Sequence, residues 1–143
     1  MLIIKIYYAM KRLLNIGFSA IILGVIATSC HDDDYESIQS IDKIKIDSVK
    51  IAKDTMEIFD IQHIKTYSSY VSQCEGFYGY DYIHNDNLTR TVTAYKFRTD
   101  ASCGQSTHQG MNQINFNPQQ TGTYTFKFWT GNNTWITKTI VVR

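Results

Sequence analysis

Residues 122–142 read Gly-Thr-Tyr-Thr-Phe-Lys-Phe-Trp-Thr-Gly-Asn-Asn-Thr-Trp-Ile-Thr-Lys-Thr-Ile-Val-Val. Apolar and polar residues alternate on both sides of the central Gly-Asn-Asn, and a period of two is typical of a strand with one buried face. Glycine and asparagine in tandem are typical of a tight hairpin loop. The stretch therefore predicts a β-hairpin that packs on a core. Its inward-facing residues are expected to be Tyr124, Phe126, Phe128, Ile136, Ile140 and Val142.

The composition downstream of Cys30 predicts strands for the rest of the chain. Leu88 is the only leucine and Pro118 the only proline in that part, whereas isoleucine, valine, threonine and aromatic residues are abundant. Such residues favour strands over helices. The alternation shifts by one residue at Asp47-Ser48, which predicts either a bulge or a strand that changes sheets. We expect strands over residues 43–52, 55–66, 76–84, 90–98, 113–116, 123–128 and 134–142.

The segment Gly122-Thr123-Tyr124-Thr125-Phe126 resembles the Gly-x-Tyr-x-Cys corner of immunoglobulin-like domains. In that motif the tyrosine hydroxyl bonds back to the chain a few residues upstream and pins the corner. Gln120 stands where the family has aspartate, and Phe126 replaces the inter-sheet cysteine. The resemblance implies an all-β fold for residues 42–143, namely an immunoglobulin-like antiparallel β-sandwich of about seven strands after an N-terminal signal helix.

The N-terminal segment has the features of a secretory signal in their usual order. From Met10 it is first basic and then apolar, and small residues separate the apolar stretch from Cys30. We therefore interpret residues 1–29 as a signal peptide. The nine residues before Met10 are unusual for a signal, so Met10 is our hypothesis for the translation start, with Met1 as the alternative. A permanent membrane helix is the alternative, but residues 13–27 are shorter than the roughly 20 apolar residues that a span needs.

Two adjacent motifs follow at the end of this segment. Ala27-Thr28-Ser29-Cys30 resembles the lipobox of bacterial lipoproteins, with alanine where leucine is usual. The acidic run Asp32, Asp33 and Asp34 resembles the signal that sends lipoproteins of one Gram-negative phylum to the cell surface. A calcium site is the alternative interpretation of this run. The run lacks, however, the glycine turn and the distal glutamate of a calcium-binding loop. The resemblance implies a lipid on Cys30, an outer-membrane anchor that faces outward, and an acidic tether over residues 30–41.

Cys74 and Cys103 remain once Cys30 is assigned to the anchor. Two thiols in an oxidising compartment are most simply a disulfide, and neither has a second cysteine or a histidine at the spacing of metal ligands. Because Phe126 occupies the usual inter-sheet cysteine position, we expect this disulfide to join the aromatic segment after Cys74 to the polar loop around Cys103.

The charge of the chain excludes one class of partner. The formal net charge is +1, and the first 29 residues contribute +3, so the part from Cys30 onward carries −2. A chain without a basic field is not expected to bind nucleic acid.

The stretch from Cys74 to His84 is the most unusual one in the chain, because tyrosines and a phenylalanine alternate with glycines. Tyrosines on a disulfide-bonded loop offer flat, amphipathic surface for a sugar or a protein partner. Aromatic residues of the same kind also fill the core of a small sandwich, and both interpretations stay open. The candidate ligand contacts are Phe77, Tyr78, Tyr80, Tyr82, Trp129 and Trp135.

No nucleophile elbow, zinc-protease helix or phosphate loop occurs in the sequence. The four histidines are scattered, and Glu75, Asp81 and Asp86 lie near expected turns rather than as a spaced acid pair. The sequence therefore predicts no catalytic residue, no metal site and no cofactor. Asp47-Ser48-Val49 and Asp54-Thr55-Met56 resemble the Asp-Ser/Thr-aliphatic sequon of the same phylum, which makes Ser48 and Thr55 candidates for O-glycosylation.

The function expected from these features is a non-enzymatic cell-surface module that binds a glycan or a protein. The alternatives are a small secreted hydrolase, acting on carbohydrate or another substrate, and a spacer in an envelope assembly. Two of Glu75, Asp81, His84 and Asp86 together in a pocket would favour the hydrolase. A flat exposed patch of Tyr78, Tyr80 and Tyr82 would favour binding.

Overall fold

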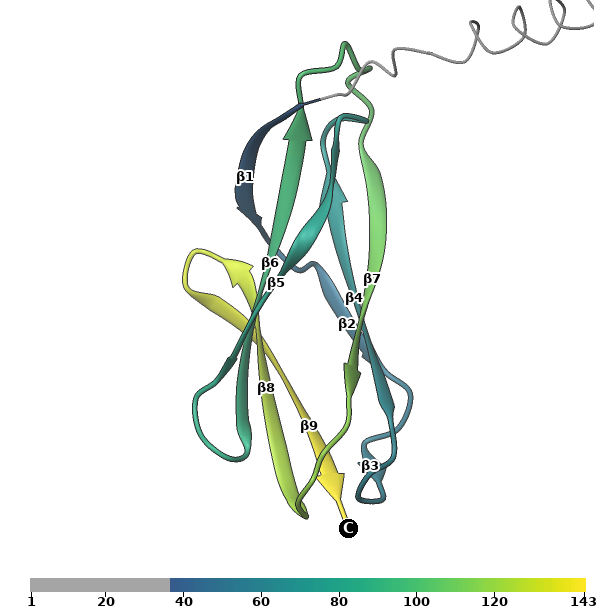
Figure 1. Cartoon of the computed structure of the whole chain (residues 1–143), viewed down its shortest axis with the longest axis vertical. Coiled ribbons are helices and arrows are strands. Elements are labelled where there is room, and N and C mark those ends of the chain that lie inside the picture. Colours follow the sequence, from purple (N-terminus) through teal and green to yellow (C-terminus); the bar gives the residue numbers. More distant parts are fainter. Residues whose placement is uncertain (1–36) are drawn as a thin grey trace, which may run out of the picture. The chain divides into compact units, whose positions relative to one another are not determined.

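Nine strands and no helix make up residues 37–143, the part of the chain that the computed structural model describes (Figure 1). No helix of the length and hydropathy needed to cross a membrane occurs in this part. The strands are β1 (Ile38–Ile44), β2 (Ser48–Ile51), β3 (Thr55–Met56), β4 (Gln62–Tyr70), β5 (Glu75–His84), β6 (Thr89–Thr99), β7 (His108–Phe116), β8 (Gly122–Gly131) and β9 (Thr134–Val142).

The strands form two sheets that pack as a β-sandwich, which confirms the predicted fold class. The larger sheet has the order β1-β6-β8-β9-β3, with β5 on the other side of β6, and the smaller sheet has the order β2-β4-β7. Most pairings are antiparallel, as expected, but β6 pairs parallel with β8, and β3 pairs parallel with β9. The N-terminal half of β6 therefore contacts β8 and its C-terminal half contacts β1.

The shift in alternation at Asp47-Ser48 marks a strand that changes sheets, one of the two structures predicted for it. β1 pairs with β6 in the larger sheet, and β2 pairs with β4 in the smaller one. At the crossing the Ile46 amide donates to the Trp129 carbonyl at 3.0 Å, and the Asp47 amide donates to the Tyr67 carbonyl at 2.8 Å. Consecutive amides thus bond to opposite layers of the sandwich.

Three predicted boundaries were wrong. The expected tether reached residue 41, but β1 begins at Ile38, because its polar, exposed residues are held by pairing with β6. The strand expected over 55–66 is interrupted after Met56 by a turn in which Phe59 has a φ of 69°, and β4 then continues to Tyr70. β7 begins at His108 rather than at residue 113, since it pairs with β4 along its whole length.

Aromatic rings fill the centre of the sandwich. Phe126, which stands at the cysteine position of the immunoglobulin-like corner, is fully buried. Its ring lies 4.9 Å from that of Phe116 in an edge-to-face arrangement and 6.2 Å from that of Phe128 in a stacked one. Phe116 belongs to the smaller sheet, so these rings join the two layers.

The predicted disulfide between Cys74 and Cys103 is confirmed, with Cα atoms 5.5 Å apart. Cys74 directly precedes β5 and Cys103 lies in the loop between β6 and β7, so the bridge joins the aromatic segment to the polar loop as expected. Of the O-glycosylation candidates, Ser48 is exposed at the start of β2 and Thr55 is half-buried in β3. Their modification stays a prediction.

The predictions for the N-terminal segment lie outside the described residues, which begin at Ser37. They are the signal peptide over residues 1–29 with its start at Met10, the lipid on Cys30, and the export signal Asp32, Asp33 and Asp34.

Candidate functional site

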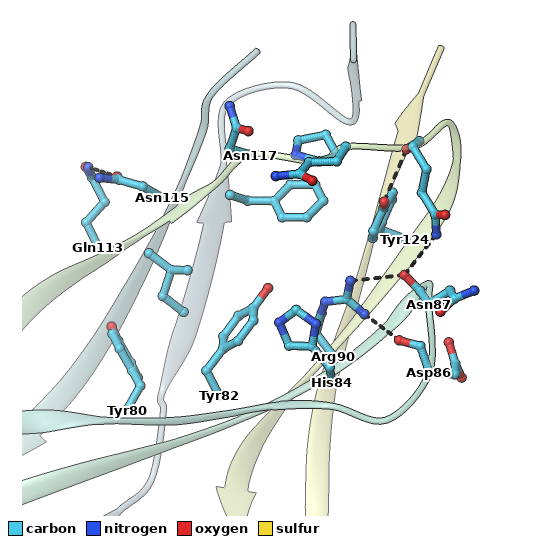
Figure 2. Close-up of a pocket in the computed structure, with 15 residues that line it drawn as sticks. Tyr80, Tyr82, His84, Asp86, Asn87, Arg90, Gln113, Asn115, Asn117 and Tyr124 are labelled. Atoms are coloured by element: carbon cyan, nitrogen blue, oxygen red, sulfur yellow. Dashed lines mark hydrogen bonds between the residues drawn. The ribbon is translucent and has the colours of Figure 1, made fainter. Parts of the chain in front are cut away.

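An open cleft of 1090 Å³ lies between β5 of the larger sheet and β7 of the smaller one (Figure 2). It continues between the turn that follows β5 and the turn that follows β7. β5 and β7 are the outer strands of their sheets here, so the space between them is open at the side of the sandwich. The sequence alone did not predict this cleft, because its two walls come from segments about 30 residues apart.

A bulge decides which residues of β5 face the cleft. The register of β5 against β6 shifts between Phe77 and Gly79, so Tyr78 drops out of the alternation and is 54% exposed. Phe77 on one side of the bulge and Tyr80 and Tyr82 on the other all pack against the core. The aromatic segment is therefore not a flat exposed patch. Its rings form the inner surface of β5, and in Figure 2 those of Tyr80 and Tyr82 point away from the strand into the cleft.

Tyr80 joins the two sheets at the inner end of the cleft. Its hydroxyl forms a hydrogen bond with the Thr66 hydroxyl on β4, and its ring lies 4.6 Å from that of Phe77. Burial raises the pKa of the Tyr80 hydroxyl, and the Thr66 bond partly opposes that rise. Because its hydroxyl group is already hydrogen-bonded within the protein, Tyr80 is chiefly a structural residue.

Tyr82 and His84 form the aromatic wall nearer the open end. Their rings are 5.4 Å apart in an edge-to-face arrangement. Burial raises the pKa of the Tyr82 hydroxyl, although the positive charge of Arg90 beside it acts in the opposite direction. Tyr82 thus offers a ring that is partly covered by the core and partly open to the cleft.

The opposite wall consists of β7 and the turn after it. On β7, Ile114 and Phe116 face inward, whereas Gln113 and Asn115 alternate with them and bond to each other and to His63 on the outer face of the smaller sheet. Asn117 donates from its amide nitrogen to the Phe59 and Asp60 carbonyls at 2.8 and 3.2 Å. The amides that line the cleft and remain for a ligand are those of the turn residues Gln119 and Gln120, which we call the amide wall. Each amide carries both donors and acceptors, which suits a ligand with many hydroxyl groups.

Arg90 lines the cleft where β6 begins, yet its side chain is only 7% exposed. Nη1 donates to the Asp86 carbonyl at 2.7 Å and to the Thr89 carbonyl at 3.0 Å, and Nη2 donates to the Asn87 carbonyl at 3.0 Å. The guanidinium also lies 5.4 Å from the centre of the Tyr124 ring. The sequence alone did not identify Arg90 as a site residue. Arg90 lies two residues before the buried Val92 on the same face of β6, and a cation on a buried face was the available indication.

Tyr124 fixes the turn that carries the amide wall. Its hydroxyl donates to the Gln120 carbonyl at 3.1 Å, which confirms the back-bond expected from the tyrosine corner. Gln120 in turn donates from its side chain to the Asn87 carbonyl at 3.4 Å, so the corner also contacts the opposite turn. The conformation of both turns around the cleft therefore depends on Tyr124.

Replacing Tyr124 with phenylalanine is expected to lower the free energy of unfolding by about 1 kcal/mol, because a partly buried carbonyl loses its donor while the ring is kept. Urea unfolding followed by tryptophan fluorescence measures the change. Tyr78→Phe is the matched control, since Tyr78 is exposed and lies at the bulge. Equal stability of the Tyr124→Phe and wild-type proteins would show that the corner bond contributes nothing.

The remaining candidate contacts lie elsewhere. Trp129 and Trp135 are opposite each other on β8 and β9 and alternate with the buried Phe128, so they face outward from the larger sheet. Trp135 is 42% exposed, and the Lys43 ammonium lies 6.0 Å from the Trp129 ring centre. Neither tryptophan lines the cleft.

The four ionisable groups considered for catalysis are only partly brought together. His84 and Asp86 both line the cleft. Glu75 is buried and forms an ion pair with Lys96 at 2.6 Å, and Asp81 is exposed outside the cleft. Asp86 accepts from the backbone amides of Leu88 and Thr89 at 2.8 and 2.7 Å, and these bonds lower the pKa of its carboxyl group. The ionised carboxylate of Asp86 therefore serves as a hydrogen-bond acceptor within the turn.

Within residues 37–143, no group of three or more histidine, cysteine, aspartate or glutamate side chains is placed to hold a metal ion. Comparison of the chain with protein-family models, with curated proteins and with solved structures finds no match. The cleft must therefore be interpreted from its own geometry.

Proposed function

We propose that this chain is a non-enzymatic surface lipoprotein whose cleft binds an oligosaccharide. The observation that carries the proposal is the pairing of an aromatic wall on β5 with the amide wall of the turn after β7 across a cleft of 1090 Å³. Sugars present apolar C–H faces and rings of hydroxyl groups, and these two walls match the two kinds of surface. A volume of this size suits a few sugar units.

The position of the cleft supports display on a tethered molecule. Ser37, the first described residue, donates from its backbone amide to Asp100 at 3.0 Å and so lies beside the C-terminal end of β6. Arg90 and the cleft lie at the N-terminal end of the same strand, and Figure 1 shows these two ends of the sandwich far apart. The proposed lipid on Cys30 precedes Ser37 in the sequence, so the anchor would leave the cleft end free to meet a ligand.

Replacing Tyr82 with alanine is expected to weaken glycan binding by about tenfold or more, because truncating a central aromatic contact typically removes that much affinity. The test uses the purified lipoprotein in detergent on a glycan array, followed by calorimetry with each glycan that binds. Tyr78→Ala is the matched control, since it removes the same side chain from the same strand outside the cleft. Equal loss in both variants, or no binding by the wild type, would contradict the proposal.

Replacing Cys30 with serine is expected to abolish incorporation of a labelled fatty acid, because the thiol is the proposed acylation site. Metabolic labelling with an alkyne fatty acid measures this. Protease accessibility on whole cells then tests outward display, which should be lost when Asp32, Asp33 and Asp34 are replaced with alanine. A labelled Cys30→Ser protein would overturn the anchor without affecting the assignment of the cleft.

A hydrolase is the second candidate, because His84 and Asp86 share the cleft. The same glycans, incubated with the protein and analysed by mass spectrometry, distinguish the two functions. Intact glycans are expected for a binding module, whereas shortened products that disappear in a His84→Ala variant would favour the hydrolase. A protein that neither binds nor cleaves any glycan would fit the spacer alternative.

A further inference from the structure

A buried cation without a carboxylate partner lies beside the cleft. Arg90 is more than nine-tenths buried, and among the described residues the ion pairs are Lys45 with Asp47 and Lys96 with Glu75. Buried charges in proteins are normally paired with an opposite charge, because removing them from water is costly. The partners of Arg90 are three backbone carbonyl groups, which carry only partial charge.

The donors of Arg90 are not all used. A guanidinium group has five N–H donors, and the three hydrogen bonds to carbonyl groups involve only Nη1 and Nη2. Nε is buried and has no hydrogen-bond partner within residues 37–143. One buried donor of Arg90 is therefore left without an acceptor, and its charge has no ion-pair partner among the described residues.

No acid among the described residues forms an ion pair with Arg90. Asp86 is near enough for its charge to interact with that of Arg90, which helps to lower the pKa of the carboxyl group, but its carboxylate oxygen is bonded to the amides of Leu88 and Thr89. Its backbone carbonyl, not its carboxylate, accepts from Arg90. Tyr82 is beside the guanidinium and its hydroxyl is a neutral partner of it, because burial raises the pKa of that hydroxyl more than Arg90 lowers it. His84 adds no negative charge.

We propose that the cleft selects anionic oligosaccharides, with the oxyanion of a carboxylate or sulfate substituent placed next to Arg90. This inference rests on the proposed glycan-binding function and adds the class of ligand to it. An oxyanion in a partly enclosed cleft interacts with a guanidinium more strongly than in water, because the surrounding protein has a lower dielectric constant. Tyr82 and the amide wall would contact the sugar rings while Arg90 supplies the preference for charge.

A purely structural role is the alternative, since Arg90 also closes the turn between β5 and β6 and stacks on Tyr124. A structural arginine would affect the binding of charged and neutral glycans to the same extent. A ligand-binding arginine would affect only the preference for the charged form. The experiment must therefore measure that preference rather than affinity alone.

Two matched pairs of probes test the inference in calorimetry with the purified lipoprotein. The first pair is a galacturonic acid oligomer and its methyl ester, and the second is a sulfated galactan oligomer and its desulfated form. The wild type is expected to bind the charged member of at least one pair about tenfold more tightly or better, as charge-assisted hydrogen bonds allow. Whichever pair shows the preference identifies the oxyanion as carboxylate or sulfate.

Arg90→Gln is expected to abolish this preference, and Lys127→Gln is the matched control because it makes the same charge change at an exposed position outside the cleft. The Nε–H resonance of Arg90 in the wild-type protein, followed by NMR during titration with the charged probe, gives a second measurement that needs no variant. It is expected to shift with the charged probe and not with the neutral one.

The outcomes separate this inference from the function on which it rests. Equal binding of charged and neutral probes, with binding still lost in Tyr82→Ala, would overturn the anionic preference and leave glycan binding intact. A preference that survives in Arg90→Gln would overturn the role of Arg90. Absence of binding to every probe and to every array glycan would overturn both proposals.

Discussion

Replacing both Cys74 and Cys103 with serine is expected to lower the free energy of unfolding by about 3–4 kcal/mol. The bridge closes a loop with a sequence separation of 29 residues, and in the chain-entropy model a loop of this length restricts the unfolded chain by that amount. A change of this size is a large part of the stability of a domain of about 100 residues. Guanidinium unfolding under non-reducing conditions measures it.

The wild-type protein treated with a reducing agent provides the control for this prediction. Its stability should fall to that of the double variant, because reduction removes the same constraint without changing side-chain size appreciably. The double variant itself should be unaffected by the reducing agent. A reduced wild type as stable as the oxidised protein would contradict the stabilising role of the bridge.

Replacing Phe126 with alanine is expected to lower the free energy of unfolding by about 3–5 kcal/mol, the usual cost of removing a large buried ring. Phe126 is fully buried and contacts Phe116 of the opposite sheet, so the cavity would open between the layers. The loss combines the transfer of the ring to water with the contacts that its neighbours lose. Thermal and urea unfolding both report the change.

Lys127→Ala is the control for this substitution, because Lys127 is the next residue of β8 and is exposed. Its effect is expected to stay within about 0.5 kcal/mol, as is usual for surface positions. Phe126→Leu should recover part of the lost stability by refilling some of the volume. A loss in Phe126→Ala no larger than that in Lys127→Ala would contradict the assignment of Phe126 to the core.

The sequence was informative where local alternation and burial agree. Tyr124, Phe126 and Phe128 alternate with polar residues and all three are buried, so the hairpin and its inner face were predicted correctly. The disulfide was predicted from cysteine number and compartment, and the change of sheet at Asp47-Ser48 from a single break in the alternation. Each of these signals is contained within one strand or follows from elementary chemistry.

The candidate site was less predictable because it depends on contacts between distant segments. The bulge in β5 decides that Tyr78 does not share the cleft face with Tyr80 and Tyr82, and the glycine at that place gave no indication of the register. The amide wall came from residues that looked like an ordinary polar turn, Gln119 and Gln120. Only the packing of β7 against the opposite sheet makes them one surface with the aromatic residues.

The pairing of β1 with the C-terminal half of β6 has a mechanical consequence for the tethered receptor proposed above. Tension applied at Ser37, against a ligand held beside Arg90, would act along the length of β6, since these residues lie at its two ends. β1 runs antiparallel to β6, so its ladder of hydrogen bonds would be loaded in shear. Shear loads all the hydrogen bonds between two strands at once instead of breaking them one after another. The pairing of β1 with β6 is thereby placed to resist separation when the proposed tether is under tension from flow.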